Sequence, residues 1–182
     1  MFGYKIFFSM KFGIIKERKN PPDRRVVFTP EELVRLQSEH PEAVVKVESS
    51  DIRVFSDEQY QNLGIKVDSD LTVCDVLFGV KEVPVDALIP NKKYFFFSHT
   101  IKKQPYNRKL LQAILEKNIE LYDHETIVDA TNRRLIGFGR YAGIVGAYNG
   151  FRAFGIKYDL FTLAKAETLS GKDELITRLK RQ

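Results

Sequence analysis

Residues 73–80, VCDVLFGV, form a short apolar run that ends directly before Lys81. Apolar residues in succession are typical of a strand that is covered on both faces, as strands of parallel sheets are. Four other runs have the same character: 11–15 (KFGII), 43–47 (AVVKV), 94–97 (YFFF) and 119–122 (IELY). The sequence therefore predicts a buried, mostly parallel sheet.

Helical segments with recognisable starts separate these runs. Thr29, Pro30 and Glu32 supply the hydroxyl N-cap, the N1 proline and the N3 glutamate of a capping box. Two further helices are predicted over residues 56–63 and from Pro105 onward. Alternating strands and helices imply parallel pairing through right-handed crossovers. We expect an α/β fold, a three-layer doubly wound sheet of the Rossmann-like or flavodoxin-like kind.

The C-terminal part of the chain has a different pattern. A polar turn over 129–134 is followed by a predicted short strand at 135–138 and a small-residue helix over 141–155. A charged helix is predicted at 172–181, with basic residues near its C-terminus. The predicted organisation is an N-terminal extension (1–9), an α/β domain (10–170) and a helix (171–182) at the boundary to a domain that this chain lacks.

Composition excludes several classes of protein. The 182 residues are enough for one domain with a substantial core, and 29 basic against 24 acidic residues leave a net charge of +5. Basic and acidic residues are interleaved, which argues against nucleic-acid binding. The single cysteine, Cys74, excludes an intramolecular disulfide. No apolar run approaches the roughly 18 residues of a membrane span. We expect a cytoplasmic protein without a membrane or nucleic-acid partner.

Three kinds of side chain lie where the predicted sheet would bind a ligand, beyond the carboxyl ends of its strands. Lys81 follows one strand and His99 another, and both can transfer protons. Arg24 and Arg25 lie in the loop after the first strand, and an arginine fork suits a carboxylate. A solvated basic loop, a surface lysine and a structural histidine are the simpler interpretations. His124 could line the same cleft.

Residues 137–143, GFGRYAG, suggest a dinucleotide-binding turn at first sight. Their spacing differs from GxGxxG, and no acidic residue ends a second strand about 20 residues later. Close helix packing explains these glycines better. Three dispersed histidines do not fit metal-ligand spacing either. We predict no cofactor-binding residue and no metal ligand in this chain.

Several motifs together resemble one family. Lys16-Glu17 followed by 25–30 (RVVFTP), then 80–84 (VKEVP), and His99 after an apolar strand resemble the alanine dehydrogenases and their relatives. Those relatives include nicotinamide nucleotide transhydrogenases and lysine-forming saccharopine dehydrogenases, also called lysine–ketoglutarate reductases. More similar to the last group are the stretches 97–107 (FSHTIKKQPYN), 121–125 (LYDHE) and 133–143 (RRLIGFGRYAG).

The resemblance implies two Rossmann-like domains with the active site between them, of which this chain resembles only the substrate-side domain. It implies that Arg25 binds a substrate carboxylate, that Lys81 and His99 act as the acid–base pair, and that Glu125 shapes the pocket. Arg24 would add a second cation for substrate binding. NAD or NADP would be bound mainly by a domain absent from this chain, so the isolated chain should be inactive. A homodimer is possible.

The substrate is expected to be an amino acid or 2-oxo acid. We favour saccharopine chemistry, because such a site must hold several carboxylates. The chain offers extra cations for this purpose: Arg24, Lys102, Lys103, Arg133 and Arg134. The alternatives are an alanine dehydrogenase-like domain and a non-catalytic ligand-binding module with the same fold.

Overall fold

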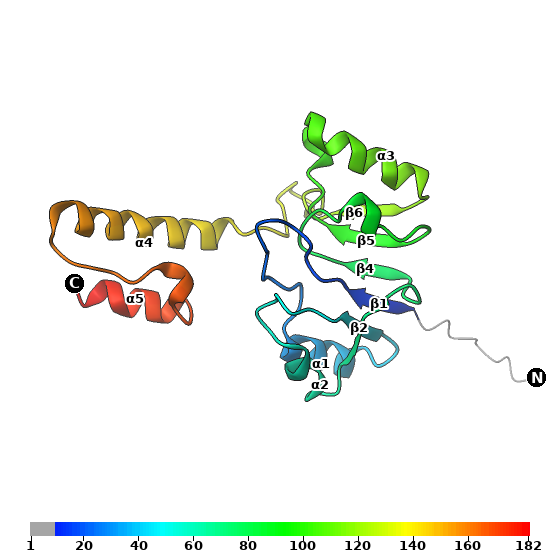
Figure 1. Ribbon diagram of the computed structural model, residues 1–182, viewed down its shortest axis with the longest axis horizontal. Coiled ribbons are helices and arrows are strands. Elements are labelled where there is room, and N and C mark those ends of the chain that lie inside the picture. Colours follow the sequence, from blue (N-terminus) through cyan, green and yellow to red (C-terminus); the bar gives the residue numbers. More distant parts are fainter. Residues whose placement is uncertain (1–9) are drawn as a thin grey trace, which may run out of the picture. The chain divides into compact units, whose positions relative to one another are not determined.

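The computed structural model describes residues 10–182 (Figure 1). The predicted extension at 1–9 lies outside the described residues. Contacts divide the chain into two compact units, one up to Leu135 and one from Ile136 to Gln182. This division differs from the predicted boundary at residue 170, which stays a prediction, and each unit is described by itself.

The first unit contains a six-stranded sheet in the order β3-β2-β1-β4-β5-β6. All five neighbouring pairs of strands are parallel. This order is the one found in doubly wound dinucleotide-binding folds. The strands are β1 (Lys11–Ile14), β2 (Val44–Glu48), β3 (Lys66–Asp68), β4 (Val76–Phe78), β5 (Lys93–Phe96) and β6 (Glu120–Asp123). The predicted fold class is confirmed, and only the edge strand β3 was not foreseen.

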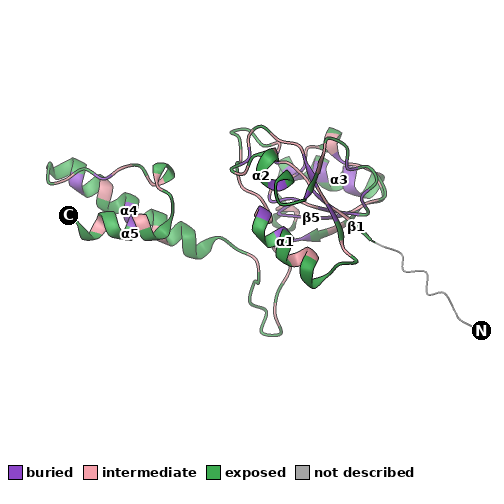
Figure 2. Ribbon diagram, turned by 90° about the horizontal axis from the view of Figure 1, so that it is seen from below, coloured by how far each residue is buried: buried purple, intermediate pink, exposed green. Residues whose placement is uncertain are grey.

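Helices cover both faces of this sheet, so the unit has three layers (Figures 1 and 2). Helices α1 (Pro30–Glu39) and α2 (Asp57–Gln61) enclose one core, in which Leu33 and Tyr60 are fully buried. Helix α3 (Arg108–Glu116) encloses the other core against β4 and β5. The side chains of Leu77 and Phe78 belong to opposite faces, as the period of a strand requires.

Local sequence signals set the ends of these helices. The Thr29 hydroxyl accepts the backbone N–H of Glu32 at 3.2 Å, and the Glu32 carboxylate accepts that of Thr29 at 3.0 Å. The predicted capping box is therefore present. Gly64, with φ of 79°, follows α2 in the left-handed conformation that glycine adopts readily. Short 3₁₀ turns connect the remaining elements: η1 (Val85–Ala87), η2 (Thr100–Lys102) and η3 (Pro105–Asn107).

The second unit consists of α4 (Gly139–Tyr158), the turn η4 (Ala166–Thr168) and α5 (Lys172–Lys180). Tyr148, Leu163 and Leu175 form its small core. Close packing is seen at Gly155, where an added Cβ would come within 2.5 Å of Phe161. At Gly143 an added Cβ would meet no atom within 4 Å, so the packing explanation fails there.

The predicted strand at residues 135–138 is wrong. The Leu135 N–H still donates to the Ile127 carbonyl at 3.0 Å, next to an isolated antiparallel bridge between Val128 and Arg134. Beyond that point no strand of the described chain pairs with the segment, and an apolar run without a partner does not form a sheet. Within residues 10–182, no helix has both the length and the apolarity needed to cross a membrane.

Candidate active site

The four predicted site loops meet at one edge of the sheet. Arg25 follows β1, Lys81 follows β4, His99 follows β5 and Glu125 follows β6. Because all strands run in the same direction, their carboxyl ends lie together. The strand order reverses between β1 and β4, and ligands of open α/β sheets bind at such a reversal.

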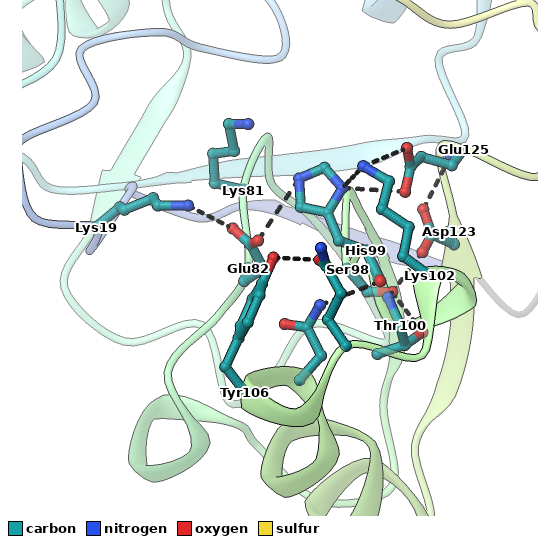
Figure 3. A network of polar contacts seen from close by, with 12 residues as sticks. Lys19, Lys81, Glu82, Ser98, His99, Thr100, Lys102, Tyr106, Asp123 and Glu125 are labelled. Carbon is teal, nitrogen blue, oxygen red and sulfur yellow. Dashed lines mark hydrogen bonds and ion pairs between the residues drawn. The ribbon is translucent and has the colours of Figure 1, made fainter.

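The imidazole of His99 lies between two carboxylates (Figure 3). Its Nδ1 is 3.0 Å from Oε2 of Glu125, and its Nε2 is 3.5 Å from Oε1 of Glu82. The backbone of His99 is left-handed, with φ of 56°, and its carbonyl accepts the Asn107 side-chain amide at 3.1 Å. A constrained backbone and two flanking carboxylates fix the ring, and either ring nitrogen can exchange a proton with a carboxylate.

The Glu125 carboxylate lies close to two cations in addition to the His99 ring. Its Oε1 lies 3.2 Å from the Lys102 ammonium and 3.7 Å from the Arg134 guanidinium. Burial by itself raises the pKa of Glu125, but the hydrogen bonds from His99 and Lys102 and their charges outweigh it, so the pKa is lowered. Two of the five extra cations seen in the sequence, Lys102 and Arg134, therefore converge on the site.

Sequence reasoning did not select Glu82. Its carboxylate lies between His99 and Lys19, whose ammonium is 3.0 Å away. The available signal was its position directly after Lys81, in the loop that follows β4. The side chains of Lys81 and Glu82 point in different directions: that of Glu82 reaches toward the β5 loop and that of Lys81 does not (Figure 3).

Lys81 is half-buried, and its ammonium makes no hydrogen bond or ion pair with the residues that the structure describes. Its backbone, by contrast, is held: the Lys81 N–H donates to the buried Glu17 carboxylate at 2.9 Å. An amine without a partner at a strand end is available for a substrate.

Arg25 forms a close ion pair with Asp23 in the loop after β1. Its Nε lies 2.9 Å from Oδ1 and 3.2 Å from Oδ2 of Asp23. The hydrogen bond from Arg25 is the main reason that the pKa of Asp23 is lowered. Arg24 is exposed, and within residues 10–182 its side chain has no ion-pair partner; its predicted role stays a prediction.

His124 does not line the cleft. It is 6% exposed, and its Nε2 lies 3.1 Å from the carbonyl oxygen of Gly79. Burial lowers the pKa of His124, so the ring is neutral at pH 7. The sequence placed it correctly next to a strand end, but its direction could not be read from the pattern.

The described residues do not fit a nicotinamide nucleotide. The GFGRYAG segment opens α4 without a preceding strand, and the loop between β1 and α1, residues 15–29, contains no glycine. A strand followed directly by a glycine-rich turn and a helix is what cradles a pyrophosphate. In the same part of the chain, no group of three or more His, Cys, Asp and Glu side chains is placed to hold a metal ion.

Fold and site together define a class: a Rossmann-like domain with lysine, histidine, arginine and carboxylates in the loops at the carboxyl edge of a parallel sheet. The alanine dehydrogenase/PNT N-terminal domain model matches residues 13–145. The chain belongs to this family.

Several characterised proteins are similar to the chain. Alpha-aminoadipic semialdehyde synthase of Arabidopsis thaliana is 33% identical over 79% of this chain, and the mitochondrial protein of Bos taurus is 37% identical over 62%. Saccharopine dehydrogenase (NAD+, L-lysine-forming) of Yarrowia lipolytica is 25% identical over 92%. The chain spans only 14%, 12% and 47% of these relatives, respectively.

Two solved structures have the same fold. An L-alanine dehydrogenase matches 83% of this chain with a TM-score of 0.64 and 18% identity, over 42% of its own length. A transhydrogenase from Sinorhizobium meliloti matches 82% with a TM-score of 0.53 and 14% identity, over 43% of its length. At these identities the likeness concerns the fold alone.

Proposed function

We propose that this chain is the substrate-binding N-terminal domain of an NAD(P)-dependent amino-acid oxidoreductase with saccharopine dehydrogenase, or lysine–ketoglutarate reductase, chemistry. The observation that supports the proposal is that Arg25, Lys81 and His99 lie in the loops after β1, β4 and β5, at the carboxyl edge of the sheet, in a chain of this family. The names of the relatives support the substrate class, since one group is called saccharopine dehydrogenase (NAD+, L-lysine-forming) and the other alpha-aminoadipic semialdehyde synthase.

In this account Arg25 binds a substrate carboxylate through its planar guanidinium, which Asp23 holds in place. Lys81 and His99 transfer protons: one to or from the substrate amine, the other to or from the water that hydrolyses an imine. Glu82 and Glu125 hold the His99 ring in one orientation. Lys102 and Arg134 add positive charge for a substrate with several carboxylates.

The nucleotide, NAD or NADP, belongs in this proposal to a domain outside the chain, because no turn in residues 10–182 fits it. The chain alone should then bind a substrate without turning it over. The proposal also includes a cytoplasmic location and a homodimer.

The experiment is a calorimetric titration of the chain with saccharopine, lysine, 2-oxoglutarate, alanine and pyruvate. We expect saturable binding of saccharopine, lost in Arg25→Ala. Arg35→Ala is the matched control, since Arg35 is exposed on α1 and its one ion pair within residues 10–182 is with Glu39 at 3.9 Å. Binding of alanine or pyruvate in preference to saccharopine would favour an alanine dehydrogenase-like site. Equal binding by wild type and Arg25→Ala would contradict the proposed role of Arg25.

A further inference from the structure

Two buried side chains from other loops hold the peptide groups that lead to Lys81. Glu17 accepts the backbone N–H of Val80 at 2.7 Å with Oε1 and that of Lys81 at 2.9 Å with Oε2. Nε2 of His124 lies 3.1 Å from the carbonyl oxygen of Gly79. Since a carbonyl can only accept, His124 is the donor and carries its proton on Nε2.

The sheet holds the remaining polar groups of this segment. The Gly79 N–H donates to the Phe95 carbonyl at 2.8 Å, and the Phe97 N–H donates to the Val80 carbonyl at 3.1 Å. Every backbone donor and acceptor from the Gly79 N–H to the Lys81 N–H therefore has a partner. The ammonium of the same lysine has none among residues 10–182. The backbone of residues 79–81 is therefore held by hydrogen bonds, whereas the Lys81 ammonium is not.

Both side chains carry a cost in stability. Glu17 is 7% exposed, and its burial raises its pKa despite the two backbone hydrogen bonds and the nearby charge of Arg25. A buried carboxylate with a raised pKa destabilises the folded protein when it is charged. The Nδ1 atom of His124 is buried and has no hydrogen-bond partner in the described chain, which is also unfavourable. Buried polar groups that carry such a cost are typical of functional sites.

We propose that Glu17 and His124 are positioning residues: together they fix residues 79–81 and so determine where the Lys81 ammonium lies in the site. This inference rests on the proposed function, which gives Lys81 its role. Glu17 belongs to the loop after β1, which is next to β4, and His124 to the loop after β6, which is two strands away, so the pair joins two other loops to the one that carries Lys81.

Substitutions at His124 can remove its hydrogen bond to the Gly79 carbonyl without changing the charge of the site. His124→Gln keeps an N–H donor at a similar reach, whereas His124→Leu removes it, and neither changes the charge of the neutral ring. Glu17→Gln keeps one acceptor and loses the other. Glu48→Gln is its control, because Glu48 is also buried (6% exposed) and accepts a backbone N–H, that of Lys16 at 2.9 Å, while its other oxygen pairs with Arg18 away from residues 79–81.

The test measures, in the full 182-residue chain, amide hydrogen exchange at Val80 and Lys81, the pH profile of Lys81 acetylation and the midpoint of urea unfolding. We expect His124→Leu and Glu17→Gln to speed exchange at these amides by up to about tenfold, the effect of losing one hydrogen bond. His124→Leu should also shift the acetylation profile. His124→Gln and Glu48→Gln should keep the wild-type exchange at Val80 and Lys81 and the wild-type acetylation profile, and every variant should still unfold cooperatively.

Saccharopine titrations of the same variants connect the result to function, with weaker binding expected in His124→Leu than in His124→Gln. Unchanged exchange and an unchanged acetylation profile in His124→Leu would overturn the positioning role. So would an equal acceleration of exchange at amides throughout the sheet, because that would report a general loss of stability and not a local effect on residues 79–81. A wild-type chain that fails to bind saccharopine would contradict the proposed function instead, while exchange and acetylation would still decide the positioning.

Discussion

Nδ1 of His99 lies 3.0 Å from Oε2 of Glu125, an ion pair that joins the ends of β5 and β6. Burial raises the pKa of Glu125, but hydrogen bonds from His99 and Lys102 lower it by more. His99→Leu keeps the carboxylate buried and removes one donor, so the pKa of Glu125 should rise. Carbon-13 NMR titration of the Glu125 carboxyl measures this change, and a pKa equal to that of wild type would contradict the arrangement.

The same pair makes stability depend on pH in a defined direction. Because the folded pKa of Glu125 lies below its ordinary value of 4.5, its contribution is present above pH 4.5 and is lost as the pH falls through the folded pKa. The acid-induced loss of unfolding free energy should be smaller in His99→Leu than in wild type. Urea unfolding between pH 3 and 6 provides the comparison, with Glu42→Gln as an exposed control.

Lys81→Met tests the proposed acid–base role in an enzyme that includes the nucleotide-binding domain. Removing a general acid or base lowers turnover by about 10²–10⁴-fold. The fold should persist, because the Lys81 ammonium makes no hydrogen bond or ion pair with the described residues. Circular dichroism checks the fold and steady-state kinetics the turnover, with Lys66→Met as the control on the exposed start of β3. Near-normal turnover in Lys81→Met would remove the residue from the mechanism.

Tyr60 provides a test of the fold that is independent of the site. Its hydroxyl donates to the Phe28 carbonyl at 2.8 Å, and the side chain is fully buried. Tyr60→Phe should lower the free energy of unfolding by about 0.5–1.5 kcal/mol, the usual worth of one hydrogen bond. Denaturant unfolding at pH 7 measures it.

The contribution of the Tyr60 hydroxyl to the free energy of unfolding should disappear at alkaline pH. Burial raises the pKa of Tyr60 to about 12 from an ordinary value of 10. The unfolded chain therefore releases this proton first, so the contribution is complete below pH 10 and is lost as the pH rises toward 12. A constant difference between wild type and Tyr60→Phe across this range would show that the phenol is not buried in this way.

The sheet could be predicted because its central strands are apolar on consecutive residues. Strand β3 (Lys66–Asp68) was missed because three residues with lysine and aspartate at the ends carry no such signal. The reverse error occurred at residues 135–138, where apolar residues have no partner strand. Leu135 and Phe138 are exposed, so an apolar run alone decided neither burial nor pairing here, because both depend on neighbours far away in the sequence.

The site was predictable where a residue directly follows a strand, as at Lys81 and His99. The roles of Glu17 and His124 were not, because each acts by turning inward and binding another loop's backbone. Glu82 shows the intermediate case, in which the loop was predicted and the direction of the side chain was not. Strand order, known only from the structure, brings these loops together.

The central claim is that Lys81 lies within the substrate site, and site-resolved acetylation tests it most directly. The rate of acetylation of each lysine would be measured by mass spectrometry with and without saturating saccharopine. We predict that saccharopine slows the reaction at Lys81 several-fold and leaves that of the exposed Lys66 unchanged. Equal rates at Lys81 with and without bound saccharopine would contradict the account.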